Sequence, residues 1–101
     1  MSMTGITTLN QAAAQQITAG SLTENMTADE RFAYIAGVTE GLAYSRFLKD
    51  RPDETGMSCI YDWFYGGKIE TRKRIDAWFA RHPDKPVGTL LYVLIKRECG
   101  A

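Results

Sequence analysis

The feature that most constrains the fold is a helix-start signal at Thr27-Ala28-Asp29-Glu30. In such a capping box, the Thr27 hydroxyl accepts a hydrogen bond from the Glu30 N–H, and the Glu30 carboxylate accepts one from the Thr27 N–H. Apolar residues then recur at helical spacing until about Lys49, and Pro52 stops the helix. The sequence therefore predicts one long helix. Its apolar positions are Phe32, Ile35, Ala36, Leu42, Ala43 and Phe47.

Further segments around this helix also have helical patterns. Leu9–Ala19 is rich in Ala and Gln, and Gly20 is a natural C-cap. We read Asp50–Ser58 as a polar loop and Cys59–Tyr65 as a short helix that ends at two glycines.

Two more helices complete the predicted fold. Thr71 is the expected N-cap of a helix over Arg72–Arg81, and a last helix starts near Pro86. The predicted fold is all-α: a compact bundle of four to five helices forming one domain over residues 1–101, with residues 1–7 expected to fray. The apolar stripe of the last helix is Val87, Leu90, Leu91, Leu94 and Ile95.

Composition excludes several functions. Twelve basic and twelve acidic side chains give a net charge of zero, so the chain has no basic excess for nucleic acid. No apolar run is long enough for membrane insertion. One His and two Cys exclude a multi-His or paired-CxxC metal site. The single histidine, His82, directly follows the predicted helix over Arg72–Arg81. We therefore predict no catalytic residue, no cofactor and no metal, and a protein that is not an enzyme.

Gly37 and Gly41 lie four residues apart inside the long predicted helix. Each costs about 1 kcal/mol of helix stability relative to Ala. Close approach of a second helix over a groove of small residues would offset that cost, so we predict close helix packing at both positions.

The two cysteines, Cys59 and Cys99, are separated by 40 positions. A bridge between them would stabilise the fold by roughly 4 kcal/mol through loop closure, and it would clamp the last helix. The alternative is a pair of buried free thiols in a cytosolic protein. A bridge implies an oxidising compartment, although residues 1–20 carry no signal-peptide pattern.

Four aromatic side chains crowd five positions: Tyr61, Trp63, Phe64 and Tyr65. They cannot all face one core, so part of this run is expected to be exposed. It either covers a thin core or forms a protein interface, which includes a homodimer interface. The basic residues Lys68, Arg72, Lys73 and Arg74 are interpreted as a solvated helix face, with docking of an acidic partner as the alternative.

The order of motifs resembles the type VI secretion amidase immunity proteins of the Rap/Tai type. The matching features are ERFAYIAGVTEGLAY (Glu30–Tyr44), a polar loop followed by Cys59, RHPDKPV (Arg81–Val87), and an apolar helix that closes on Glu98-Cys99-Gly100. Family members commonly carry a further cysteine near the first helix, which this chain lacks.

The resemblance implies a non-enzymatic periplasmic protein, its signal peptide removed, with Cys59 and Cys99 bridged. Its partner would be a cell-wall amidase effector, bound and occluded, often by a dimer. The loop Asp50–Ser58 is the expected inhibitory element because a rigid loop keeps more binding free energy for affinity. The partner-binding residues that we predict are Asp53, Glu54, Thr55, Met57, Tyr61, Trp63 and Tyr65.

Two other functions fit the same pattern. One is a periplasmic acid-stress chaperone similar to HdeA, in which protonation of the carboxylates below about pH 3 loosens the fold and exposes apolar surface. The other is a cytosolic helical interaction module with free thiols.

Overall fold

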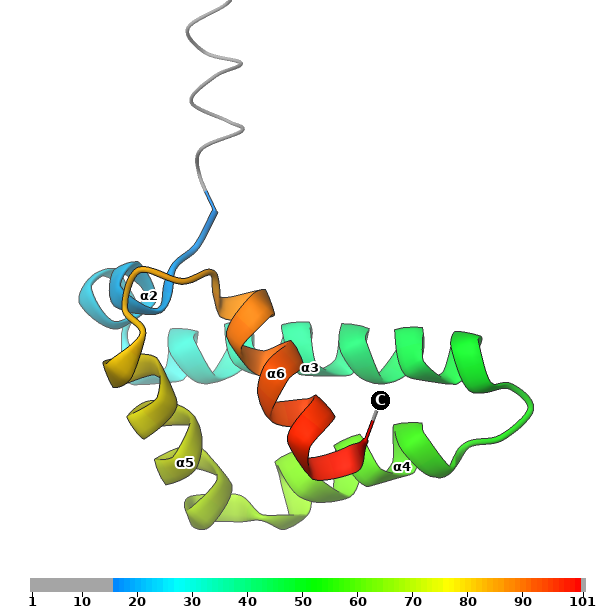
Figure 1. The fold of residues 1–101 in the computed structure, drawn as a ribbon. Helices are drawn as coiled ribbons and strands as arrows, with labels where there is room; N and C mark the ends of the chain where they lie inside the picture. Colours follow the sequence, from blue (N-terminus) through cyan, green and yellow to red (C-terminus); the bar gives the residue numbers. More distant parts are fainter. Residues whose placement is uncertain (1–15, 101) are drawn as a thin grey trace, which may run out of the picture.

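Helix α3 (Ala28–Asp50) is the longest element of the fold, and α4 and α6 pack against it (Figure 1). The computed structural model describes residues 16–100. The predicted capping box is confirmed: the Glu30 N–H donates to the Thr27 hydroxyl at 3.2 Å, and the Thr27 N–H donates to the Glu30 carboxylate at 2.8 Å. The predicted start at Thr27 is therefore correct, and the helix runs one residue beyond Lys49.

The fold is all-α, as predicted, and residues 16–100 contain no strand. In Figure 1, α4 returns below α3, α5 forms the left side, and α6 crosses in front of α3. No helix of the described residues is long and apolar enough to cross a membrane. The elements besides α3 are α2 (Ala19–Asn25), α4 (Thr55–Tyr61), the π-helical turn η1 (Asp62–Gly66), α5 (Lys68–Arg81) and α6 (Val87–Cys99).

The main core lies where the first half of α3 meets α2, α5 and α6. Trp78 of α5 ties two of these helices together, because its indole N–H donates to the Leu90 carbonyl of α6 at 3.1 Å. The buried side chains of this main core are Ala19, Leu22, Ile35, Phe64, Ile75, Phe79, Val87, Leu90, Leu91 and Leu94.

A second, smaller core joins the other half of α3 to α4 and the end of α6. Its buried side chains are only Ala43, Ile60 and Ile95. The Cys59–Cys99 disulfide, with 5.8 Å between the Cα atoms, links α4 to α6 beside it. The bridge that the sequence left open is therefore present, and neither cysteine is free.

The first predicted helix is wrong where the structure describes it. Ala19 and Gly20 begin α2 instead of ending a helix, and Thr18 is the N-cap. The Gly20 N–H donates to the Pro83 carbonyl at 2.8 Å, and an added Cβ would lie only 3.0 Å from that oxygen. This glycine allows close backbone approach and is no C-cap. Residues 9–15 of the predicted helix, and the fraying predicted for residues 1–7, lie outside the described residues.

Two other helix starts also differ from prediction. Helix α4 begins at Thr55, so the predicted loop Asp50–Ser58 shrinks to residues 51–54. Helix α5 begins at Lys68, so Thr71 is not its N-cap. The Thr71 hydroxyl instead donates to the Trp63 carbonyl at 2.8 Å, and the Gly67 N–H donates to the same carbonyl at 3.3 Å.

The close packing predicted at Gly37 and Gly41 is wrong within this chain. Both glycines face solvent, and a Cβ added at either would meet nothing within 4 Å. The buried positions of α3 are Ile35, Thr39 and Ala43, which lie on a different face of the helix.

We expect opposite outcomes from two Gly→Ala substitutions. Gly41→Ala should raise the free energy of unfolding by about 0.5–1 kcal/mol, because it removes backbone entropy from the unfolded chain without a clash. Gly67→Ala should lower it by about 1–3 kcal/mol, because the new Cβ would overlap the Thr71 hydroxyl and lie 2.7 Å from the Trp63 carbonyl oxygen. Urea unfolding measures both. A loss of stability in Gly41→Ala would mean that something covers this face of α3.

We expect the free energy of unfolding of the double variant Cys59→Ser/Cys99→Ser to be about 4 kcal/mol lower than that of the wild type. The reason is that the bridge closes a 40-residue loop next to a core of three buried side chains. Denaturant unfolding with and without reductant measures the loss. Reductant should reproduce it in the wild type and leave the double variant unchanged; equal stability of all four samples would contradict the expectation.

Candidate partner-binding surface

The turn between α3 and α4 projects from one end of the molecule, at the right in Figure 1. We call residues 51–55 the tip. Asp53, Glu54 and Thr55 are all exposed there. The Asp53 carboxylate accepts a hydrogen bond from the Thr55 N–H at 2.9 Å, which orders the turn into α4. Hydrogen bonds from the Thr55 hydroxyl and N–H lower the pKa of Asp53 below its ordinary value.

Arg46 links the end of α3, next to the tip, to the C-terminal end of α6. Its Nε donates to the Asp50 carboxylate at 2.6 Å, and its Nη atoms donate to the carbonyls of Gly100 and Cys99 at 3.0 and 3.3 Å. The guanidinium lies against Gly56, where an added Cβ would collide with it. Its side chain is only 16% exposed, so these charge-assisted bonds are partly shielded from water. The tip is thus held on one side by Arg46 and on the other by the disulfide.

A shallow acidic groove runs along α4 from the tip toward η1. Glu54, Ser58 and Asp62 repeat every four residues on its α4 side, and Glu98 of α6 lines the opposite side. No Lys or Arg lines this acidic groove within the described chain, and residues 16–100 contain no cluster of His, Cys, Asp or Glu that could hold a metal ion. The groove therefore presents three solvent-facing carboxylates, which suits a cationic or hydrogen-bond-donating partner.

The predicted partner-binding residues do not form one surface. Glu54, Thr55 and Trp63 line the acidic groove, and Asp53 adjoins it in the tip. Met57 is instead half-buried against the small core.

Two of the predicted aromatic residues, Tyr61 and Tyr65, belong to the side of α4 and η1 that faces α3. Their rings stack with 6.3 Å between centroids. The Tyr65 hydroxyl donates to the Glu40 carboxylate of α3, which raises the pKa of Tyr65. The aromatic run is thus split, with Phe64 buried, Tyr65 42% exposed and the other two half-buried. Part of the run is exposed, as the sequence predicted.

Sequence reasoning missed Asp62 and Glu98 as groove residues. The i, i+4, i+8 spacing of Glu54, Ser58 and Asp62 was available, but it has meaning only on a helix. Because the sequence predicted a loop as far as Ser58, it did not indicate that these three residues lie on one face of a helix. Glu98 reaches the groove through the packing of α6 on α4, which no local pattern encodes.

No family model, no curated protein and no solved structure matches this chain. The resemblance to the amidase immunity proteins stays a prediction carried by its sequence motifs.

We expect Asp53 to titrate below an ordinary Asp, and Thr55→Ala to move its pKa upward, because the Thr55 hydroxyl is the largest cause of the shift. A lowered folded-state pKa means that any stabilisation from this carboxylate is present above the ordinary Asp pKa and is lost as the pH falls through the folded value. Carboxyl carbon NMR shifts follow the titration. Thr89→Ala, at an exposed position of α6, should leave it unchanged; an unmoved pKa in Thr55→Ala would contradict the assignment.

Proposed function

We propose that this protein is a non-enzymatic, immunity-type inhibitor that binds a cell-wall amidase effector through the tip and the adjoining acidic groove. The observation that carries the proposal is that the exposed tip joins α3 and α4, which form a helical hairpin that is anchored at two points. Arg46 and the Cys59–Cys99 disulfide hold its two sides. A loop that is already ordered before binding loses little entropy on entering a cleft, so more of the contact free energy remains as affinity.

The chemistry of the tip suits occlusion of a polar cleft. Asp53 and Glu54 are exposed acceptors at its end. Asp62 and Glu98 extend the negative surface along the groove. Carboxylates presented in this way are complementary to N–H donors or cations that line the cleft of an enzyme, and they also steer its approach.

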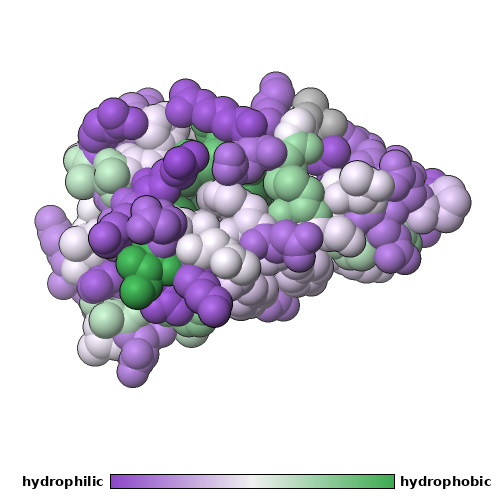
Figure 2. All heavy atoms as spheres, turned by 90° about the horizontal axis from the view of Figure 1, so that it is seen from below, coloured by the Kyte–Doolittle hydropathy of each residue, from purple (hydrophilic) through white to green (hydrophobic). Residues whose placement is uncertain are grey.

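Periplasmic location and a homodimer belong to the same proposal. The disulfide supports an oxidising compartment, because such bonds are rare in the cytosol. The face seen in Figure 2 is mainly hydrophilic with small, separate hydrophobic areas. Within residues 16–100, the exposed large apolar side chains that a homodimer could use are Tyr44, Leu48, Tyr65, Ile69 and Tyr92.

The test is inhibition of purified peptidoglycan amidases by the disulfide-bonded protein. For an amidase that the wild type inhibits, Asp53→Asn/Glu54→Gln should weaken inhibition by roughly 10- to 100-fold, since both exposed tip carboxylates are removed at the contact. Residual amidase activity against peptidoglycan, measured over an inhibitor titration, gives the inhibition constant.

A matched control removes two exposed carboxylates elsewhere. Glu24→Gln/Asp84→Asn makes the same change of charge in α2 and in the loop before α6. It should inhibit as the wild type does. Equal inhibition by both double variants would exclude the tip as the contact, and failure of the wild type to inhibit any amidase in the set would remove the proposed function.

A further inference from the structure

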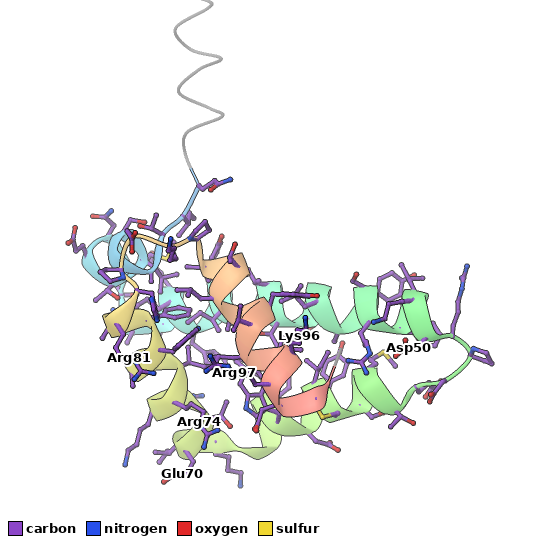
Figure 3. All side chains as sticks on the ribbon, viewed as in Figure 1. Asp50, Glu70, Arg74, Arg81, Lys96 and Arg97 are labelled. Atoms are coloured by element: carbon purple, nitrogen blue, oxygen red, sulfur yellow. A yellow bond between two sulfur atoms is a disulfide. The ribbon has the colours of Figure 1, made fainter. Side chains whose placement is uncertain are left out.

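A second groove lies between α5 and α6 and has the opposite charge. Arg74, Trp78 and Arg81 share one face of α5, and Arg97 reaches the groove from α6. Figure 3 shows Arg74 and Arg97 at the space between these two helices, with Arg81 further along α5. We call this surface the arginine groove. It contains three guanidinium groups and, from Glu98 at its rim, one carboxylate.

Trp78 organises the arginine groove. Its indole N–H is bonded to the Leu90 carbonyl, which fixes the ring between the two helices. The guanidinium carbons of Arg97 and Arg81 lie 4.8 and 5.5 Å from the ring centroid, within the range of cation–π attraction. Stacking on a fixed ring restricts both side chains, so their N–H donors are partly pre-organised.

Among the described residues, only one of the three guanidinium groups of this groove has a carboxylate partner. Within residues 16–100, the carboxylate nearest to these arginines is that of Glu98, 3.8 Å from Arg74, and both of these side chains are substantially exposed. No carboxylate of the described residues comes within 4 Å of Arg81 or Arg97. Two neighbouring guanidinium groups without anionic partners repel each other, and a bound anion would relieve that repulsion.

We propose that the arginine groove binds an acidic segment of a partner protein, one with carboxylates about 10 Å apart. Arg81 lies seven positions after Arg74, which is about 10 Å along a helix. A single small anion cannot bridge that span. Acidic side chains three residues apart on a peptide in the polyproline II conformation can, because that conformation has three residues per turn and a rise of about 3.1 Å per residue, so both side chains lie on the same side about 9 Å apart. Guanidinium groups also bind carboxylates in a bidentate manner.

A peptide fits this groove better than nucleic acid does. The indole N–H of Trp78 is occupied and its ring carries the guanidinium groups, so it does not offer a free platform for base stacking. The Glu98 carboxylate at the rim would repel a phosphate backbone, and the chain as a whole has zero net charge. The proposal concerns a different surface from the tip and does not depend on the amidase proposal.

Fluorescence anisotropy of labelled peptides tests the proposal. The probe is a short Glu-Gly-Gly repeat, with Gln-Gly-Gly as its neutral counterpart and oligothymidylate as the nucleic-acid competitor. We expect the wild type to bind only the Glu peptide at low ionic strength and to lose it as salt is added. Arg81→Gln/Arg97→Gln should weaken binding by roughly tenfold or more. Lys73→Gln, an exposed α5 position outside the groove lining, should change it by less than about twofold.

A substitution that should strengthen binding provides a test whose expected result misfolding could not produce. Glu98→Gln removes the rim carboxylate beside Arg74 and should strengthen binding of the Glu peptide by about two- to threefold. The proposal is overturned by absence of binding in the wild type, by equal losses in Lys73→Gln and the double arginine variant, or by tighter binding of oligothymidylate than of the peptide.

Discussion

The covalent link between α4 and α6 is the constraint on which the far end of this molecule depends. The main core holds α2, α5 and the first halves of α3 and α6, but the hairpin beyond it rests on three buried side chains. Burying each of the two Ile side chains contributes about 1.5–3 kcal/mol and the Ala43 methyl group about 0.8 kcal/mol, and closing the loop with Cys59–Cys99 adds roughly 4 kcal/mol. Arg46 then bonds to the carbonyl of the bridged Cys99, so the polar clamp relies on the covalent one.

The π-helical turn explains how the aromatic run is accommodated. An uninterrupted α-helix through residues 55–66 would spread four aromatics around its surface. In η1, the wider turn directs Phe64 into the main core, where it stacks on Phe32 at 5.8 Å, and leaves Trp63 half-buried beside the acidic groove. At the end of η1 the Trp63 carbonyl accepts hydrogen bonds from both the Gly67 N–H and the Thr71 hydroxyl, which joins the turn to α5. One local irregularity thus positions both a core residue and a groove residue.

Local signals in the sequence predicted what is determined locally. The capping box at Thr27 and the apolar stripe of the last helix required no knowledge of distant contacts, and both are confirmed. The N-cap residue of α4, Glu54, makes no side-chain cap hydrogen bond, so the start of this helix lacks a signal like the capping box at Thr27. Gly20 resembles a C-cap in sequence, but the Pro83 carbonyl beside it, 63 positions away, decides its role. The acidic groove could not be predicted because it depends on that helix start and on where α6 packs.

Net charge was the least informative property of this chain, for a physical reason. A sum of zero excludes a strong uniform field, but it is silent about separation of charge over the surface. Here the acidic groove lies on one side of the C-terminal end of α6 and the arginine groove lies on the other, and Glu98 borders both grooves. Because the next residue is the bridged Cys99, the position of Glu98 is covalently fixed relative to α4. The disulfide that stabilises the hairpin therefore also fixes the boundary between two adjoining surfaces of opposite charge.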